Sequence, residues 1–400
     1  MERITFSVID NPPVDARYGN LTTATLPSNT TTNTVGRTIN MRNSPLLIEN
    51  YASLTYLQFA FQSYDGGMDD CTCMTIQLCS ILRRCPHLVH LFLESGGAVR
   101  HGECIDQVLF YCPRLETLVL SPNAEMPPSI LDQRMNHNDI NDNYDNVAHI
   151  EKRKLKNLVM VGGDIKLTPQ HLIKMYQKYH TTLELLYLQY NGEWSEPISL
   201  SELARLGTPR LREFRLKSDI QRSSYNEIEP SLQRWKKAHR PIQQALENFF
   251  SSSSDCKNLQ VIQLTNKYPI RARAEADCHI HVDDPVLEAI AKNCSRLRYM
   301  DLTGVCDYSY PDGLVQFATI LGTQQQQLQL GYLKLYVGDS TDVALEMVQQ
   351  LSTLKEFHIV PRYPFQRHTL ADRFELSSVP LLMRDRGGTL TVGGIIPHTH

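Results

Sequence analysis

The 400-residue sequence lacks a strong net charge, a long apolar run and a secretory leader. Its formal net charge is -3, so no general field draws it to nucleic acid or to an anionic membrane. The basic runs at 152–156 and 234–240 are short, and we interpret them as solvated faces. No apolar run could span a bilayer, and the start MERITFSVIDNPP lacks the basic and apolar parts of a signal peptide. We therefore expect a protein of the cytoplasm, the nucleus or both, without nucleic-acid or membrane partners.

The sequence also lacks the short motifs of common enzymes. It has no glycine-rich phosphate loop with the required lysine and no G-x-S-x-G motif. Gly387, Gly388, Gly393 and Gly394 do not fit the dinucleotide-binding spacing G-x-G-x-x-G. We predict that the protein is not an enzyme and needs no cofactor.

Metal-ligating residues occur, but not at the spacing of known metal sites. The segment 139–151 begins like a calcium loop, yet it has Tyr144 where the turn needs glycine and Ile150 where a bidentate glutamate is needed. The cysteines and histidines in 71–85 and 278–281 do not form the paired C-x-x-C of a zinc site. We therefore predict no metal centre.

The 10 cysteines are numerous enough for a disulfide framework, but their positions favour another interpretation. Four of them lie three residues before a leucine that starts a predicted strand: Cys85, Cys112, Cys256 and Cys294. A position repeated in this way is typical of a small buried hydrophobic residue, because disulfide partners would not stack at equivalent places in successive repeats. We predict reduced, buried thiols.

The stretch PVLEAIAKNCSRLRYMDLTGVC, residues 285–306, combines a short helix with a short strand. Its first half has apolar residues at i, i+3, i+4 and i+7, namely Leu287, Ile290, Ala291 and Cys294. This spacing predicts the apolar stripe of an amphipathic helix. Leu297, Met300 and Leu302 then follow L-x-x-L-x-L, whose last positions alternate as in a strand. A unit this small cannot bury its own apolar face, so it must be repeated.

The strand motif recurs along most of the chain and predicts about ten units. The motifs start at Leu54, Leu88, Leu115, Leu155, Leu183, Leu211, Leu259, Leu297, Leu330 and Leu354. The shorter intervals match the leucine-rich-repeat period of roughly 20 to 29 residues. Longer intervals indicate insertions at 121–149, 218–255 and 265–284, the second with a helix around 231–250.

These observations predict an α/β leucine-rich-repeat solenoid over residues 46–360. We expect a curved horseshoe with parallel strands on its concave side and helices on its convex side. Residues 1–45 are rich in Thr, Asn and Ser, and we expect a flexible or poorly ordered segment there. Residues 361–400 are expected to form a C-terminal cap or tail.

Three stretches carry a resemblance to a known family: CPHLVHLFLES, CPRLETLVLSP, and IAKNCSRLRYMDLTGVC followed by DGLVQFATIL. They resemble the cysteine-containing repeats of F-box/leucine-rich-repeat proteins over roughly 46–360. The resemblance implies a substrate-recognition subunit of an SCF-type ubiquitin ligase, with the ligase adaptor and a cullin as partners. No F-box motif is recognisable, and the only tryptophans are Trp194 and Trp235. The resemblance therefore extends to an F-box-lacking relative. The alternative is a non-ligase scaffold or regulator that binds one protein through its concave face.

Residues between the inward leucines of such a solenoid face its groove. Because aromatic residues and arginine are favoured at binding hot spots, this position supplies candidate partner-binding residues. They are Phe92, Tyr187, Gln189, Arg215, Lys217, Tyr299, Asp301, Tyr332, Lys334, Tyr336 and His358. For each residue the alternative is packing against its neighbours along the sheet. We expect a chain that is monomeric by itself and binds a protein on this face.

Overall fold

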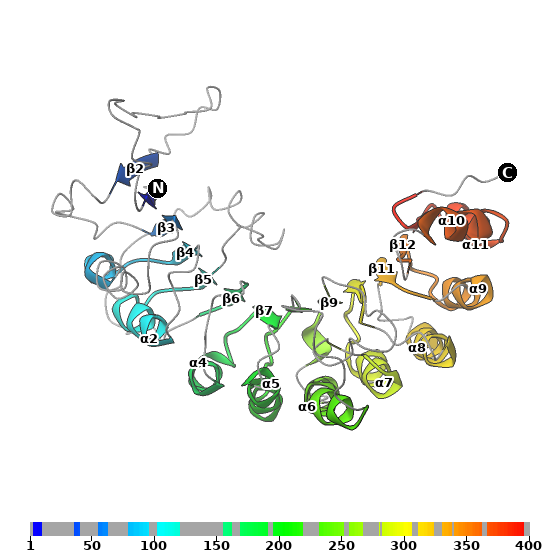
Figure 1. Ribbon diagram of the computed structural model, residues 1–400, viewed down its shortest axis with the longest axis horizontal. Helices are drawn as coiled ribbons and strands as arrows, with labels where there is room; N and C mark the ends of the chain where they lie inside the picture. Colours follow the sequence, from blue (N-terminus) through cyan, green and yellow to red (C-terminus); the bar gives the residue numbers. More distant parts are fainter. Residues whose placement is uncertain are drawn as a thin grey trace. The chain divides into compact units, whose positions relative to one another are not determined.

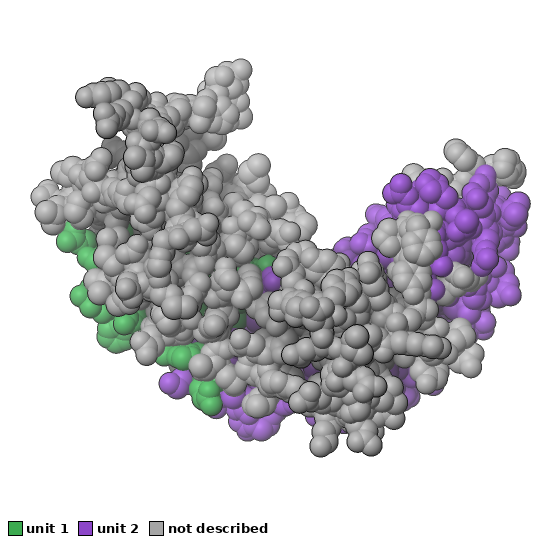
Figure 2. Space-filling view, viewed as in Figure 1, with its two compact units in different colours: residues 1–171 green, residues 172–400 purple. Residues whose placement is uncertain are grey.

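The computed structural model describes residues 3–9, 36–40, 55–62, 79–95, 102–120, 155–161, 169–190, 195–218, 232–251, 256–266, 280, 282–305, 311–323, 330–337, 340–361 and 366–395. The chain divides into two compact units, residues 1–171 and 172–400 (Figure 2). Each unit is built from parallel strands and helices. The two units are described one at a time.

In the first unit the strands form parallel pairs in the order β2-β1-β3-β4-β5-β6. The strands are β1 (Arg3–Ile9), β2 (Gly36–Asn40), β3 (Tyr56–Gln62), β4 (His90–Ser95), β5 (Thr117–Leu120) and β6 (Asn157–Met160). Helix α2 (Gly102–Tyr111) connects β4 to β5. Strands β1 and β2 fall within the segment 1–45, where composition predicted little order. The alternating Ile4, Phe6 and Val8 of β1 are typical of a strand.

In the second unit the strand order follows the sequence from β7 to β13, and neighbouring strands are parallel. The strands are β7 (Leu185–Tyr190), β8 (Glu213–Ser218), β9 (Val261–Asn266), β10 (Tyr299–Asp301), β11 (Tyr332–Leu335), β12 (Glu356–Ile359) and β13 (Thr389–Val392). The helices are α4 (Pro169–Tyr179), α5 (Ser195–Leu206), α6 (Leu232–Ser251), α7 (Asp284–Asn293), α8 (Pro311–Thr323), α9 (Thr341–Gln350), α10 (Arg367–Glu375) and α11 (Val379–Asp385). From α5 to α9 successive helices contact each other on one side of the strands (Figure 1).

One backbone corner recurs in several repeats, just before the strand begins. The amide of the strand's first leucine donates to the carbonyl of the residue three positions earlier, which in four repeats is the predicted cysteine. The bonds are Leu88 to Cys85 (3.1 Å), Leu115 to Cys112 (3.1 Å), Leu259 to Cys256 (3.0 Å) and Leu297 to Cys294 (3.1 Å). In a fifth repeat Leu354 donates to Leu351 in the same way, at 3.1 Å. The corner explains why the sequence spacing is constant at this point of the repeat.

The predicted burial of the repeated cysteines is confirmed, since all four are buried free thiols. Burial raises the pKa of the Cys85 thiol to about 12, and burial together with the neighbouring Cys85 and Cys79 raises that of Cys112 to about 12. Burial also raises the pKa of Cys294, and the neighbouring Cys256 raises it further. These side chains are neutral packing groups of the core.

A strand begins two residues after the first leucine of each of the ten predicted motifs, and the helix predicted near 231–250 is α6. The sequence spacing did not single out α5, α10, α11 or β13. The insertion at 121–149, and with it the calcium-like segment up to residue 151, lies outside the described residues, as do Cys71, Cys73 and residues 278, 279 and 281. The fold is an α/β leucine-rich-repeat solenoid with an open, parallel sheet on one side and helices on the other.

Candidate functional site

Strands β8 to β13 of the second unit present one sheet face that is partly exposed. Along β8 and β9 every second side chain is partly exposed, and those between are buried. Strands β11, β12 and β13 alternate in the same way. The buried side chains pack toward the helices, so the partly exposed ones lie on the opposite side of the sheet. We call this side the open face.

Parallel register arranges the side chains of the open face in two rows that run across the strands. The first row is Glu213, Val261, Tyr299, Tyr332, Glu356 and Thr389. The second row is Arg215, Gln263, Asp301, Lys334, His358 and Thr391. Residues that are far apart in sequence therefore become neighbours on the open face, as the repeat predicts.

Three rings of the open face form a continuous aromatic stack. The rings of Tyr299 and Tyr332 are parallel to within 9°, with centroids 4.1 Å apart. The ring of His358 lies 4.8 Å from that of Tyr332, at an angle of 31°. At the other end, the Arg215 guanidinium lies 5.9 Å from the Tyr299 ring centroid, within reach of a cation–π interaction. Cross-strand contacts thus hold these four side chains in place before any partner binds.

Arg215 is also held by hydrogen bonds to two neighbouring side chains of the open face. Its Nη1 donates to Gln263 Oε1 at 2.6 Å, and its Nη2 donates to Glu213 Oε2 at 3.1 Å. Its side chain is 12% exposed. A guanidinium fixed by two neighbours presents a defined edge to the open face rather than a mobile charge.

Asp301 is the buried carboxylate of the second row and fixes Lys334. Asp301 Oδ1 accepts from the Thr303 amide at 3.0 Å and from the Thr303 hydroxyl at 2.6 Å. Its Oδ2 lies 3.7 Å from Lys334 Nζ, and the exposed fractions of the two side chains are 5% and 34%. The lysine is therefore held over the open face by a carboxylate beneath it.

Both tyrosines of the stack are harder to ionise than a free tyrosine. Burial raises the pKa of Tyr299, and the carboxylate of Asp301 raises it further. The pKa of Tyr332 is raised by burial first, then by Tyr299 and Asp301. Both side chains are neutral phenols near neutral pH and can donate or accept a hydrogen bond.

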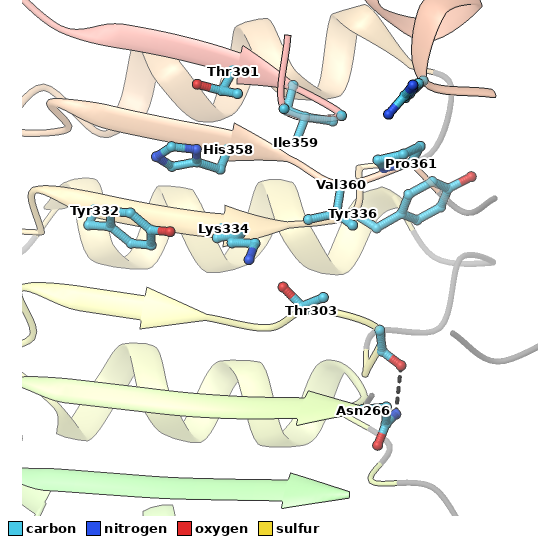
Figure 3. Close-up of a pocket in the computed structure, with 14 residues that line it drawn as sticks. Asn266, Thr303, Tyr332, Lys334, Tyr336, His358, Ile359, Val360, Pro361 and Thr391 are labelled. Atoms are coloured by element: carbon cyan, nitrogen blue, oxygen red, sulfur yellow. Dashed lines mark hydrogen bonds between the residues drawn. The ribbon is translucent and has the colours of Figure 1, made fainter. Parts of the chain in front are cut away.

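A pocket of about 490 Å³ opens beside this stack, at the carboxyl ends of β9 to β13. It is lined by Asn266, Thr303, Gly304, Tyr332, Lys334, Tyr336, His358, Ile359, Val360, Pro361, Arg367, Thr391, Gly393 and Gly394. Figure 3 shows Tyr332 and Lys334 of β11 beside His358 of β12, with Tyr336 and Pro361 toward the strand ends. Pockets of this size hold one or two side chains or a small ligand.

Asn266 organises the floor of the pocket at the end of β9. Its side-chain amide donates to the carbonyl of Gly304 at 2.6 Å (Figure 3) and to that of Ile280 at 2.9 Å. Its Oδ1 accepts from the amide of Ile280 at 3.1 Å. The side chain is 3% exposed and ties the end of β9 to the segment before α7 and to the segment after β10. Its role is structural.

The pocket gathers four of the predicted partner-binding residues, Tyr332, Lys334, Tyr336 and His358. Arg215, Tyr299 and Asp301 lie next to them in the two rows, while Gln189 and Lys217 are partly exposed at the ends of β7 and β8. Four predicted residues are largely buried: Phe92 (3% exposed), Asp301 (4%), Tyr187 (7%) and Tyr336 (8%). In the first unit, the Phe92 ring stacks on that of Tyr56 with centroids 4.9 Å apart. Contact of any of these residues with a partner stays a prediction.

The sequence did not identify Arg367, Thr391, Gly393 and Gly394 as parts of the site. Arg367 begins α10, and the two glycines follow β13, so all come from the segment 361–400. The only available signal was the repeat period itself, because placing one more strand after β12 would have put Thr391 in the second row.

Neither metal coordination nor a membrane span emerges from the part of the chain that the structure describes. Within it, no three His, Cys, Asp or Glu side chains are grouped so that they could hold a metal ion. Its helices are all too short or too polar to cross a membrane. The residues that line the pocket can form hydrogen bonds, ion pairs and aromatic contacts.

No protein-family model matches the chain, and no curated protein matches its sequence. Among solved structures, the crystal structure of the Rad7 and Elc1 complex from yeast matches 77% of this chain and 70% of that chain, with 14% sequence identity and a TM-score of 0.39. A likeness this distant carries no conclusion about function. The chain's own repeat geometry identifies it as a leucine-rich-repeat solenoid.

Proposed function

We propose that the chain is a protein-interaction module that binds a partner through the open face of β8 to β13. The observation that carries the proposal is the partly exposed ladder of Arg215, Tyr299, Tyr332 and His358. Tyrosine and arginine are enriched at binding hot spots. Here they are already ordered by contacts with each other. A preordered surface loses little conformational freedom on binding, which favours affinity.

The more specific proposal is a substrate-recognition subunit, or an F-box-lacking relative, in an SCF-type ubiquitin ligase. It rests on the cysteine-containing repeats at residues 85–95, 112–122 and 290–306, which resemble those of F-box/leucine-rich-repeat proteins. In this role the chain would position a bound protein for modification by other subunits. It would carry out no chemistry itself.

The test is affinity capture of partners from native cells with two forms of the full chain. The first form carries Tyr332→Ala and His358→Ala on the open face. The second carries Gln244→Ala and Lys292→Ala, two changes on helices α6 and α7. We expect one protein to be lost from the first form and retained by the second, as measured by quantitative mass spectrometry.

The same capture separates the general proposal from the specific one. Recovery of the ligase adaptor and a cullin with both forms supports the substrate-recognition role. A single partner that is lost from the open-face form, without ligase subunits, supports the non-ligase scaffold or regulator instead. Equal recovery of every protein by both forms would overturn binding through the open face.

A further inference from the structure

The pocket at the carboxyl ends of β9 to β13 is lined, among the described residues, by basic side chains and by no acidic ones. Lys334, Arg367 and His358 line it, and none of its described lining residues is aspartate or glutamate. Hydroxyl groups of Tyr332 and Thr391 supply further hydrogen-bond donors, and Ile359, Val360 and Pro361 supply apolar surface. This lining is complementary to an anionic group attached to an apolar chain.

We propose that the pocket binds an acidic side chain, Asp or Glu, in an extended segment of the partner protein. The inference rests on the proposed function, because it assigns a chemical class to the partner of the open face. Tyr332 and His358 belong both to the aromatic stack and to the pocket, so the two surfaces are continuous. A partner segment that lies across the aromatic stack can therefore place its following side chains in the pocket.

The balance of charges around the pocket favours a single negative charge. Lys334 is already matched by Asp301, whose carboxylate lies 3.7 Å away. His358 Nε2 lies 3.4 Å from the Glu356 carboxylate. Arg367 is exposed, and no described residue pairs with it. One cation is therefore left unmatched, which fits a carboxylate better than a dianionic phosphate.

Gly393 lets Arg367 approach the pocket closely. The turn after β13 closes through two bonds between Val392 and Ile395, of 2.7 and 2.9 Å, with Gly393 and Gly394 at φ of 58° and 83°. The Gly393 amide donates to the Ile359 carbonyl at 2.9 Å. A Cβ on Gly393 would lie 2.6 Å from the Cβ of Arg367, so only glycine allows this approach. The arginine is thus placed by the fold at the edge of the pocket.

The experiment uses a random peptide library on phage, selected against the purified full-length chain. We expect the recovered peptides to share an Asp or Glu next to an apolar residue. Each recovered peptide is then synthesised with its acid changed to the matching amide, and affinities are measured by fluorescence anisotropy. Loss of the ion pair should weaken binding about tenfold.

Variants of the chain then locate the interaction. Arg367→Gln should weaken the acidic peptide about tenfold and leave the amide peptide unchanged, because the two changes remove the same interaction. Arg367→Lys should recover part of the loss. Arg210→Gln is the matched control, since Arg210 is exposed in the turn before β8, at the opposite end of the strand, and should have no effect.

Three results would overturn the inference: recovered peptides without an acidic preference, unchanged affinity in Arg367→Gln, or tighter binding when phosphoserine replaces the acid. Failure of the pocket is distinguishable from failure of the open face. If cellular capture loses the partner with the open-face form but keeps it with Arg367→Gln, the pocket proposal fails and the proposed function stands. If the peptide results hold but the open-face form keeps every cellular partner, the proposed function fails and the pocket chemistry stands.

Discussion

Two sets of strands in this chain use the same repeat but differ on the side of the sheet away from the helices. In the first unit, β5 and β6 are buried at every position on both sides. In the second unit, β8 and β9 are buried on one side and partly exposed on the other. The difference lies in the residues between the inward leucines, which are Val119 and Val159 in one set and Arg215 and Gln263 in the other.

This comparison separates what the repeat requires from what it leaves free. The inward leucines are buried in both sets because they build the core. The opposite side can be covered, as in TLVL and NLVM, where Val119 and Val159 are apolar and the buried Asn157 amide donates to the Thr117 hydroxyl. It can also be polar and open, as in EFRLKS. Only the second arrangement leaves a surface for a partner.

The largest effect should come from placing a charge on the covered side. Val159 is 0% exposed, so Val159→Glu would bury a carboxylate without a partner. We expect the free energy of unfolding to fall by about 4 kcal/mol or more. Urea unfolding monitored by circular dichroism measures this loss.

The matched control places the same residue at the equivalent position of the open face. Gln263 is partly exposed and its Oε1 accepts from the charged guanidinium of Arg215, so Gln263→Glu would turn this hydrogen bond into an ion pair. We expect a change in unfolding free energy within about 1 kcal/mol. Similar costs for the two variants would show that the two sides do not differ as the comparison states.

A smaller and equal effect is expected on the side that the two sets share. Leu118 on β5 and Leu333 on β11 occupy the same place in the repeat, and both are 0% exposed. Leu118→Ala and Leu333→Ala should each reduce the unfolding free energy by about 2 to 5 kcal/mol. Leu376→Ala is the control, because Leu376 is 88% exposed and should cost almost nothing. A near-neutral result for either buried leucine would contradict a common core.

The sequence predicted the strands wherever buried leucines kept their spacing. All ten motifs contain the start of a strand, because the inward side must be apolar in every repeat. The motif did not identify strand β13, because its first leucine position, three residues before Leu390, is occupied by Gly387. Gly387 adopts a φ of 67°, a backbone conformation that favours glycine over leucine. The turn requires a glycine where the motif has its first leucine, so the motif did not predict β13.

The candidate site was predictable only as far as the register of the sheet determines it. Tyr332, Lys334 and His358 were identified because alternation alone assigns them to the groove side. Arg367 could not be identified, since its place depends on how α10 meets the turn after β13. The contacts among Arg215, Tyr299 and Tyr332 also depend on three-dimensional spacing. Periodicity assigns a side of the sheet, but not the neighbours that a side chain meets there.

The smallest expected effect is a shift in the pKa values of Tyr299 and Tyr332, which distinguishes the open face from ordinary exposed surface. Because burial and Asp301 raise the pKa of Tyr299 and Tyr332, both should stay neutral above pH about 10, where free tyrosine ionises. Their contribution to stability is then fully present below pH about 10 and is lost as the pH rises through their folded pKa values. Nuclear magnetic resonance of ring-labelled tyrosine measures this, with Tyr332→Phe assigning one signal. Asp301→Asn should lower both pKa values, because it removes a carboxylate that opposes phenolate formation at each ring. If both tyrosines ionise at the pH of free tyrosine and Asp301→Asn changes neither pKa, then the two rings are solvated and the Asp301 carboxylate does not affect their ionisation.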